Sequence, residues 1–222
     1  MDENQTSAEI PTGPAILADG VEKRYGTGSA PVVALRGISL KVERGERVAL
    51  LGKSGSGKST LLNLLGGLDR PTEGRLMVDG RDLSKLSADG LADFRLGSVG
   101  MIFQAYNLIP SRTALENVEL PMILSGQSRE IRREQAREAL ESVGLGKRLD
   151  HHPAELVNRP AILLADEPTG NLDSPTARSI MELLAEHLGR HETTLVMVTH
   201  DEELAEAHSD RIVRLKDGQV IE

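Results

Sequence analysis

A glycine-rich segment in the first third of the chain has the residue types needed to bind phosphate groups. It fits the pattern Gly-x-x-x-x-Gly-Lys-Ser/Thr and reads Gly52, Lys53, Ser54, Gly55, Ser56, Gly57, Lys58, Ser59. Its glycines let backbone N–H groups converge on phosphate oxygens at the start of a helix. Lys58 can reach the β- and γ-phosphates of a nucleotide, and the Ser59 hydroxyl can ligate Mg²⁺. We expect a nucleotide site here.

The alternative for this segment is an ordinary glycine-rich turn in front of a helix. It is disfavoured, because the apolar run Arg47–Leu51 precedes the segment and a helical run from Thr60 to Leu65 follows it. A strand before the loop and a helix after it is the context that the phosphate-binding motif requires.

Two adjacent carboxylates end an apolar run later in the chain. Ala161–Ala165 has the composition of a buried strand, and Asp166 and Glu167 follow it directly. Such a strand can direct Asp166 towards Mg²⁺ held by Ser59, while Glu167 points elsewhere and can deprotonate a water aligned with the γ-phosphate. An acidic helix cap is the alternative, since Pro168 comes next, but the phosphate-binding segment upstream argues against it.

Two kinds of strand must position these residues. Ala15–Arg24, Val32–Val42 and Arg47–Leu51 have strand patterns, and turns typical of hairpins occur at Asp79-Gly80 and at Asp217-Gly218. Ala161–Ala165 and Thr194–Val198 are apolar throughout, with the amphipathic run Pro175–Leu188 between them. Apolar strands separated by helices predict a parallel sheet that is covered on both faces.

A charged segment interrupts this α/β pattern in the middle of the chain. Ser128–Ser142 is predicted to be a helix with Ile131, Gln135 and Ala139 on one stripe. Leu124-Ser125-Gly126-Gln127, just before it, is interpreted as a loop that ends at the next helix.

Composition excludes several classes of protein. The chain has 222 residues, no cysteine and a net charge of −8. It therefore has no disulfide framework and no thiol catalysis. Its apolar runs are far shorter than the ~20 residues that cross a bilayer, and its first residues lack the basic start of a signal peptide. Acidic charge and four aromatic residues argue against a nucleic-acid binder. We expect a soluble, cytosolic protein.

Several segments together resemble the ATP-binding-cassette ATPases, and in particular the LolD type within the subfamily that serves lipoprotein-releasing and MacB-type transporters. Leu164–Asp173 is similar to the Walker B and D-loop segment, and the others are Leu65–Gly74, Phe103–Pro110 and Thr113–Val118. The likeness runs from about Ala15 to Glu222. Residues 1–14 lie outside it and are polar with two prolines, which predicts a flexible tail. The likeness implies a single α/β domain over 15–222. That domain would have a P-loop NTPase (RecA-like) core, an antiparallel β subdomain and a truncated helical subdomain at about 105–157.

The resemblance also assigns roles to residues. It implies that Tyr25 stacks on adenine, although a half-exposed strand tyrosine is the alternative, and that Thr60 belongs to the nucleotide site with the glycine-rich segment. Gln104 matches the Q-loop glutamine, which reaches Mg²⁺ and the attacking water. The implied catalytic set is Glu167, His200 and Gln104, and the implied metal ligands are Ser59, Gln104 and Asp166. Asp173 matches the aspartate that acts across the dimer interface.

The family further implies a homodimer that drives integral membrane subunits from the cytoplasmic face of the inner membrane, with ATP and Mg²⁺ as cofactors and no nucleic acid. Lipoprotein release is the leading function, and a MacB-type efflux or FtsE-like ATPase is an alternative. A second alternative is a nucleotide-binding subunit or truncated paralogue that hydrolyses ATP poorly. A soluble cassette acting on DNA or ribosomes is disfavoured by the acidic charge.

One family element is missing from the sequence. Relatives carry an L-S-G-G-[QE]-Q signature and a following helix before the Walker B strand, whereas here His151–Pro160 leads straight into Ala161. Both flanks match, so the gap corresponds to roughly 14 residues, about four helical turns. Leu124–Gln127 is not a displaced signature, because it precedes the charged helix instead of following it. We therefore expect ATP binding with very slow hydrolysis, and a short bridge without a helix over Leu156–Asn158.

Overall fold

A parallel sheet forms the centre of the molecule. The computed structural model describes residues 13–26, 31–102, 112–142, 146, 149, 160–170 and 174–221. The sheet has the strand order β10-β9-β3-β8-β7-β6, and β10 alone runs antiparallel to its neighbour. Its strands are β3 (Arg47–Leu51), β6 (Val99–Ile102), β7 (Ile162–Asp166), β8 (Thr194–Thr199), β9 (Arg211–Lys216) and β10 (Gln219–Val220).

Both faces of this sheet are apolar, as its buried strands predict. In β3, Val48 and Leu50 belong to one buried cluster, while Ala49 and Leu51 belong to another on the opposite face. The same alternation holds along β7 and β8, because successive side chains of a strand point to opposite faces. Each face must therefore be covered by another layer.

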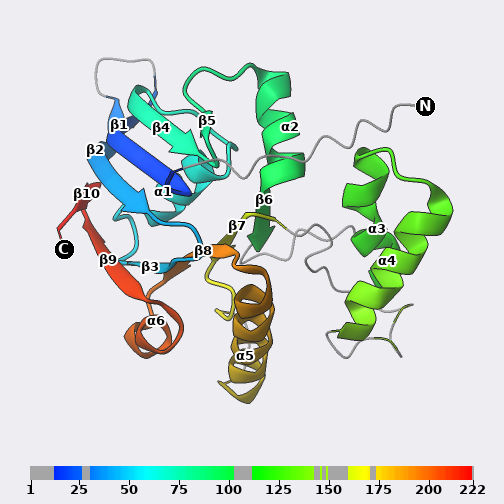
Figure 1. The fold of residues 1–222 in the computed structure, drawn as a ribbon. Coiled ribbons are helices and arrows are strands. Elements are labelled where there is room, and N and C mark those ends of the chain that lie inside the picture. Colours follow the sequence, from blue (N-terminus) through cyan, green and yellow to red (C-terminus); the bar gives the residue numbers. More distant parts are fainter. Residues whose placement is uncertain are drawn as a thin grey trace.

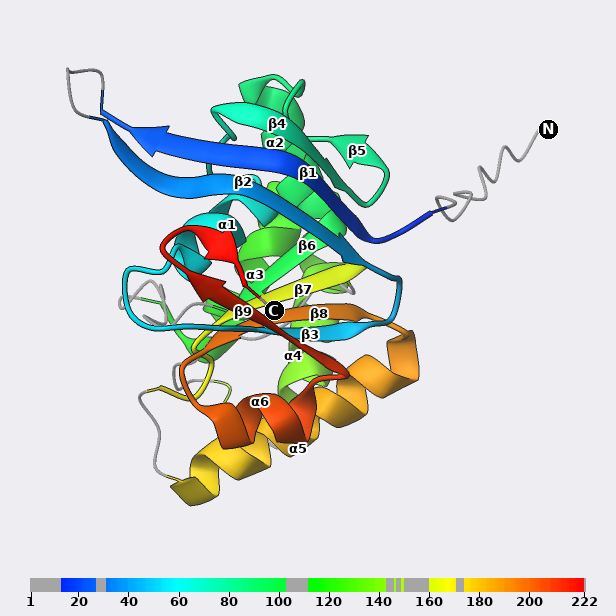
Figure 2. The same cartoon turned by 90° about the vertical axis from the view of Figure 1, so that its left-hand side faces the viewer.

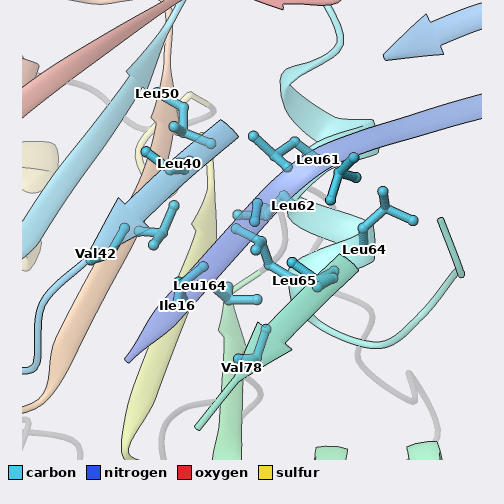
Figure 3. Close-up of a cluster of buried hydrophobic side chains, with 14 of the residues drawn as sticks. Ile16, Leu40, Val42, Leu50, Leu61, Leu62, Leu64, Leu65, Val78 and Leu164 are labelled. Atoms are coloured by element: carbon cyan, nitrogen blue, oxygen red, sulfur yellow. The ribbon is translucent and has the colours of Figure 1, made fainter. Parts of the chain in front are cut away.

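An antiparallel sheet and one helix cover the first face. The sheet has the order β2-β1-β4-β5, built from β1 (Ile16–Tyr25), β2 (Val32–Val42), β4 (Glu73–Val78) and β5 (Arg81–Asp82). Helix α1 (Lys58–Leu65) lies between the two sheets (Figure 2) and buries four leucines. Figure 3 shows these leucines among Ile16, Val78 and Leu164. The start of α1, where the glycine-rich segment ends, is thereby fixed against both sheets.

Two further helices cover the second face (Figure 2). They are α5 (Ser174–His191) and α6 (Glu202–His208), and Met181, Leu184 and Ala205 belong to the cluster that they form with the sheet. The Asp201 side chain caps α6 by accepting a hydrogen bond from the Leu204 N–H at 3.0 Å. The sheet is thus covered on both sides.

Helices α3 (Ala114–Leu124) and α4 (Arg129–Ser142) lie beyond β6, apart from the antiparallel sheet (Figure 1), and α2 (Ala88–Ser98) leads into β6. Helices α3 and α4 form a small apolar cluster of their own. Thr113 and Glu116 close a capping box at the start of α3. Within the described ranges, no helix combines the length and the apolar character needed to cross a bilayer.

The predicted fold class is confirmed, with the parallel core and the antiparallel subdomain in place. The strands predicted at Val32–Val42 and Arg47–Leu51 have the predicted bounds, and both predicted turns connect antiparallel pairs. Helix α1 begins at Lys58, two residues before the predicted start. The short elements α2, β6, α3 and α6 were not predicted.

The stripe predicted for α4 is wrong. Ala136 and Leu140 are buried against α3, while Ile131 is 53% exposed and Gln135 is also exposed. Burying Gln135 would desolvate an amide without a partner, whereas Ala136 and Leu140 are four residues apart and present one apolar face. Ala139 packs at the margin of that face.

Some predictions fall outside the described residues. These are the tail up to residue 12, Gln104, the region 151–159 with the missing signature, and Asp173. The domain bounds stay a prediction as well, although α3 and α4 lie within the range predicted for a helical subdomain.

Candidate functional site

Three loops that carry the predicted residues meet at one edge of the parallel sheet. The glycine-rich segment follows β3, Asp166 and Glu167 come at the end of β7, and His200 follows β8. These three strands are adjacent and parallel, in the order β3-β8-β7. The carboxyl ends of parallel strands are where open α/β sheets bind ligands. This edge is therefore the candidate site.

The glycine-rich loop is packed closely against its surroundings. A Cβ added to Gly52 would come within 2.4 Å of the Leu215 carbonyl oxygen, and one at Gly57 would lie 2.8 Å from the Ala34 carbonyl oxygen. Gly57 caps α1 with φ 102°, a left-handed conformation that glycine adopts without strain. The loop conformation thus depends on glycine at these two positions.

Lys58 lies within this loop. Its Nζ donates hydrogen bonds to the Gly52 carbonyl at 2.6 Å and to the Lys53 carbonyl at 3.1 Å, and the residue is only 7% exposed. The Ser56 hydroxyl is buried beside it and has no hydrogen-bond partner in the part of the chain that the structure describes. A buried cation and an unpaired hydroxyl next to a helix N-terminus suit an anionic ligand.

Ser59 and Asp166 face one another across the loop. The Ser59 hydroxyl donates a long hydrogen bond of 3.5 Å to Asp166 Oδ1. Burial raises the pKa of Asp166 above its usual value, and the negative charge of Glu167 adds to this shift, while the bond from Ser59 and the Lys58 charge oppose it. A hydroxyl and a carboxylate are oxygen ligands of the kind that Mg²⁺ prefers, so these two residues fit the predicted metal.

Glu167 and His200 form a second pair. The distance from His200 Nδ1 to Glu167 Oε1 is 3.0 Å. Glu167 has φ 46°, and its N–H donates to the Val198 carbonyl at 2.9 Å, so the chain leaves β7 sharply after Asp166. The two adjacent carboxylates therefore point to different neighbours, as the sequence predicts. A left-handed conformation at a non-glycine residue is a strain that functional sites often retain.

Tyr25, at the end of β1, is 41% exposed. Its hydroxyl donates a hydrogen bond to Asp69 Oδ2 at 3.0 Å, and the Lys23 Nζ lies 4.9 Å from the centre of its ring. Burial raises the pKa of Tyr25, and Asp69 adds to this effect. Sequence reasoning missed Lys23 and Asp69, although Asp69 lies in a segment that carries the family resemblance.

The β9–β10 turn supports the glycine-rich loop from behind. The Gly218 N–H donates to the Ser56 carbonyl at 3.0 Å, and the Gly218 carbonyl accepts from the Arg36 N–H at 2.8 Å. A Cβ at Gly218 would lie 2.6 Å from the Ala34 carbonyl oxygen. The turn itself was predicted from the sequence, but its contact with the loop was not.

A pocket of about 430 Å³ lies at the opposite edge of the sheet, between the amino ends of β3 and β8. Its two arginines already pair with carboxylates, Arg44 with Asp79 at 3.0 Å and Arg47 with Asp210 at 2.5 Å. It is also remote from the three loops described above. Charge and position therefore favour the carboxyl edge as the functional site.

Comparison with known proteins identifies a protein family and relatives that this chain matches. Residues 35–170 match the family model of the ABC transporters. The chain is 48% identical over 219 residues to the macrolide export ATP-binding/permease protein MacB of Rhodopirellula baltica, covering 91% of this chain but only 32% of that protein. It is 45% identical over 221 residues to the lipoprotein-releasing system ATP-binding protein LolD of Xanthomonas campestris, covering 93% of this chain and 92% of that protein.

A solved structure has the same architecture. The dimeric ATP-binding cassette MJ0796, in a post-hydrolysis state bound to ADP and Pi, superposes with a TM-score of 0.85 at 40% identity. The alignment covers 93% of this chain and 97% of that one. Fold, family model and relatives agree with the resemblance predicted from the sequence, and the chain belongs to the ATPase cassettes of the ABC transporter family.

Proposed function

We propose that this chain binds Mg²⁺-ATP at the carboxyl edge of its parallel sheet, as the ATP-binding subunit of a membrane transporter. The glycine-rich loop, the Asp166–Glu167 pair and His200 all lie at that edge, and this arrangement is the main support for the proposal. The solved relative bound to ADP and Pi supports a nucleotide as the ligand.

Each residue has a task in this proposal. The loop N–H groups and the Lys58 ammonium bind the β- and γ-phosphates. Ser59 and Asp166, with Gln104, would hold Mg²⁺, which neutralises phosphate charge when bound. Glu167 accepts the proton of the attacking water, and His200, 3.0 Å from Glu167, keeps that carboxylate oriented and contacts the γ-phosphate. Thr60 contributes to the nucleotide site from the first turn of α1.

The transport role is proposed from the relatives. We place the chain as a homodimer on the cytoplasmic face of the inner membrane, where it drives integral membrane subunits that release lipoproteins. Its match over nearly the whole LolD protein supports this role, and the dimeric state of the solved relative supports the homodimer. The 48% identity to a MacB protein favours macrolide export as the second candidate.

The missing signature limits this activity. In the family, the signature of one chain completes the γ-phosphate site of the other. Removing one donor from a transition-state site typically costs ~10²–10³ in rate. We propose that the 222-residue chain binds ATP and hydrolyses it very slowly.

Calorimetric titration with Mg²⁺-ATP tests the binding site. Lys58→Ala removes a charge-assisted phosphate contact worth ~1.5–3 kcal/mol, so its affinity should fall by about ten-fold or more. Lys85→Ala is the matched control, because this exposed lysine pairs with Asp82 far from the loop. Equal affinities of wild type and Lys58→Ala would refute the proposed site.

A depletion experiment in the source cells separates the two transport candidates. Retention of lipoproteins in the inner membrane is the outcome expected for lipoprotein release. Macrolide sensitivity with normal lipoprotein sorting would instead establish the second candidate and overturn the first.

A further inference from the structure

We propose that Asp69 is a positioning residue for the nucleotide base, because it fixes the Tyr25 ring relative to the phosphate-binding helix. Lys23 completes this arrangement by covering one face of the ring. This inference rests on the proposed function, in which Tyr25 stacks on adenine, and it extends that role to two residues to which nothing has yet given a function.

Asp69 joins three groups in one small cluster. Its Oδ2 accepts from the Tyr25 hydroxyl at 3.0 Å, and its Oδ1 accepts from Lys23 Nζ at 2.6 Å. The Lys23 ammonium also donates to the Arg70 carbonyl at 2.8 Å. Lys23 is 9% exposed, so the ion pair is partly shielded from water and its geometry is well defined.

Asp69 is itself attached to the end of α1. The Leu68 and Asp69 N–H groups both donate to the Asn63 carbonyl, at 2.9 and 3.3 Å. The Asp69 carboxylate also accepts from the Arg70 N–H at 2.7 Å. Helix α1 begins at Lys58, so a continuous series of hydrogen bonds connects the phosphate-binding loop, through α1 and Asp69, to the phenol of Tyr25.

The two faces of the Tyr25 ring differ. The Lys23 ammonium lies over the ring, 4.9 Å from its centre, which is a cation–π distance. A base must therefore stack on the other face. The ring is tethered at its hydroxyl and covered on one side, so it presents a single preorganised surface at a fixed place relative to the phosphates.

The competing interpretation is that the Lys23–Asp69 ion pair only stabilises the β subdomain. In that case, neutralising Asp69 would affect every ligand of the site equally. A positioning role affects only ligands that have a base. Inorganic tripolyphosphate binds the phosphate loop but has no base, so the ratio of Mg²⁺-ATP affinity to Mg²⁺-tripolyphosphate affinity isolates the contribution of the base.

The experiment measures this ratio by calorimetry in five variants. Asp69→Ala removes the acceptor for the Tyr25 hydroxyl, whereas an amide at this position would still donate to it. Tyr25→Phe keeps the ring but loses the donor. Each should lower the ratio about three-fold or more with tripolyphosphate affinity unchanged, and the double variant should lower it no further than Asp69→Ala alone. Asp82→Ala is the matched control: Asp82 pairs with Arg75 and accepts from the Ser84 N–H but does not touch Tyr25, so the ratio should be unchanged.

Tyr25→Ala separates this inference from the proposed function. Since stacking of a base on an aromatic ring typically changes affinity about five-fold or more, a lower ratio in Tyr25→Ala is expected. An unchanged ratio there would refute the stacking role itself. Where Tyr25→Ala does lower the ratio, the positioning role of Asp69 is overturned if Asp69→Ala leaves the ratio unchanged, lowers both affinities equally, or adds its full effect to that of Tyr25→Phe.

Discussion

Asp166 and Glu167 are adjacent in the chain but contact different neighbours. The surroundings of Asp166 make ionisation of its carboxyl group unfavourable. Burial and the charge of Glu167 raise the pKa of Asp166. A carboxylate with a raised pKa in the folded state is stabilising when protonated, and that advantage is lost as the pH rises through the raised value. At neutral pH, a carboxyl group at position 166 therefore lowers the stability of the nucleotide-free protein relative to a neutral side chain of the same shape.

Asp166→Asn should consequently stabilise the nucleotide-free protein at pH 7. A gain on the order of 1 kcal/mol would raise the melting temperature by ~2–4 °C in a chain of this size. The same substitution should remove the further rise that Mg²⁺ adds in the presence of ATP, because the amide is a poorer Mg²⁺ ligand. Differential scanning calorimetry measures both effects. A lower melting temperature without nucleotide would contradict the electrostatic explanation.

Glu167→Gln tests the other carboxylate. In a variant with the signature restored, this substitution should abolish phosphate release and leave Mg²⁺-ATP affinity nearly unchanged, because the amide keeps the shape of the side chain but cannot accept a proton. The Glu182→Gln variant, an exposed position on α5, serves as the control. Turnover that persists in Glu167→Gln would remove Glu167 from the role of general base.

At the scale of elements, the β9–β10 turn and the phosphate loop act as one unit. Gly218→Ala would place a methyl group 2.6 Å from the Ala34 carbonyl oxygen in a left-handed conformation. Backbone strain of this kind costs ~1–3 kcal/mol, and the turn must also move away from Ser56. Both the melting temperature and the ATP affinity should fall.

Gly126→Ala is the matched control for this turn. Gly126 has φ 76°, but a Cβ there meets nothing within 4 Å, so only the conformational strain remains. It should lower the melting temperature modestly and leave ATP affinity unchanged. If Gly218→Ala behaves in the same way, the turn does not support the loop.

A surface ion pair between β3 and the residue just before β9 predicts a pH dependence. Arg47 contacts Asp210 at 2.5 Å, and its hydrogen bond to Asp210 is the main cause of the lowered pKa of that carboxyl. A lowered pKa stabilises the folded state above the ordinary value of about 4, and the contribution is lost as the pH falls through the folded value. In Asp210→Asn, the melting temperature should therefore decrease less steeply between pH 5 and pH 3. Identical slopes would show that the pair contributes nothing.

The sequence predicts those parts of the fold and site that depend on local pattern. The strand at Arg47–Leu51 follows from its composition, and the convergence of Ser59, Asp166 and His200 follows from parallel strands that end at one edge. The contact between Tyr25 and Asp69 spans 44 positions and depends on the register of β1 against β4, which no local pattern specifies. The prediction of the buried face of α4 was wrong for a similar reason, because packing against α3 determines which face is buried.

At the scale of the whole molecule, the proposal that the signature is missing predicts a low catalytic rate. The chain as it stands should release phosphate from ATP very slowly. Inserting a family signature and its helix, roughly 14 residues and about four helical turns, between Leu156 and Val157 should raise the rate by 10²-fold or more. A phosphate-release assay at saturating Mg²⁺-ATP compares the two proteins.

Sedimentation gives an independent measurement of the same prediction. The restored variant that also carries Glu167→Gln should form a dimer when Mg²⁺-ATP is added, and the unmodified sequence with Glu167→Gln should stay monomeric. Turnover of several per second by the unmodified chain, or a tight ATP-dependent dimer of it, would show that the signature is dispensable here.

The order of strands in the parallel sheet has a consequence for synthesis on the ribosome. Strand β3 is flanked by β8 and β9, with Arg47 opposite Leu195 and Val48 opposite Arg211. These partners emerge about 150 residues later, which corresponds to roughly 7–30 s at ordinary elongation rates. During that interval both edges of β3 lack their strand partners, although its side chains can already pack against β1, β2 and α1. We therefore expect the nucleotide site to be complete only after β9 has left the ribosome.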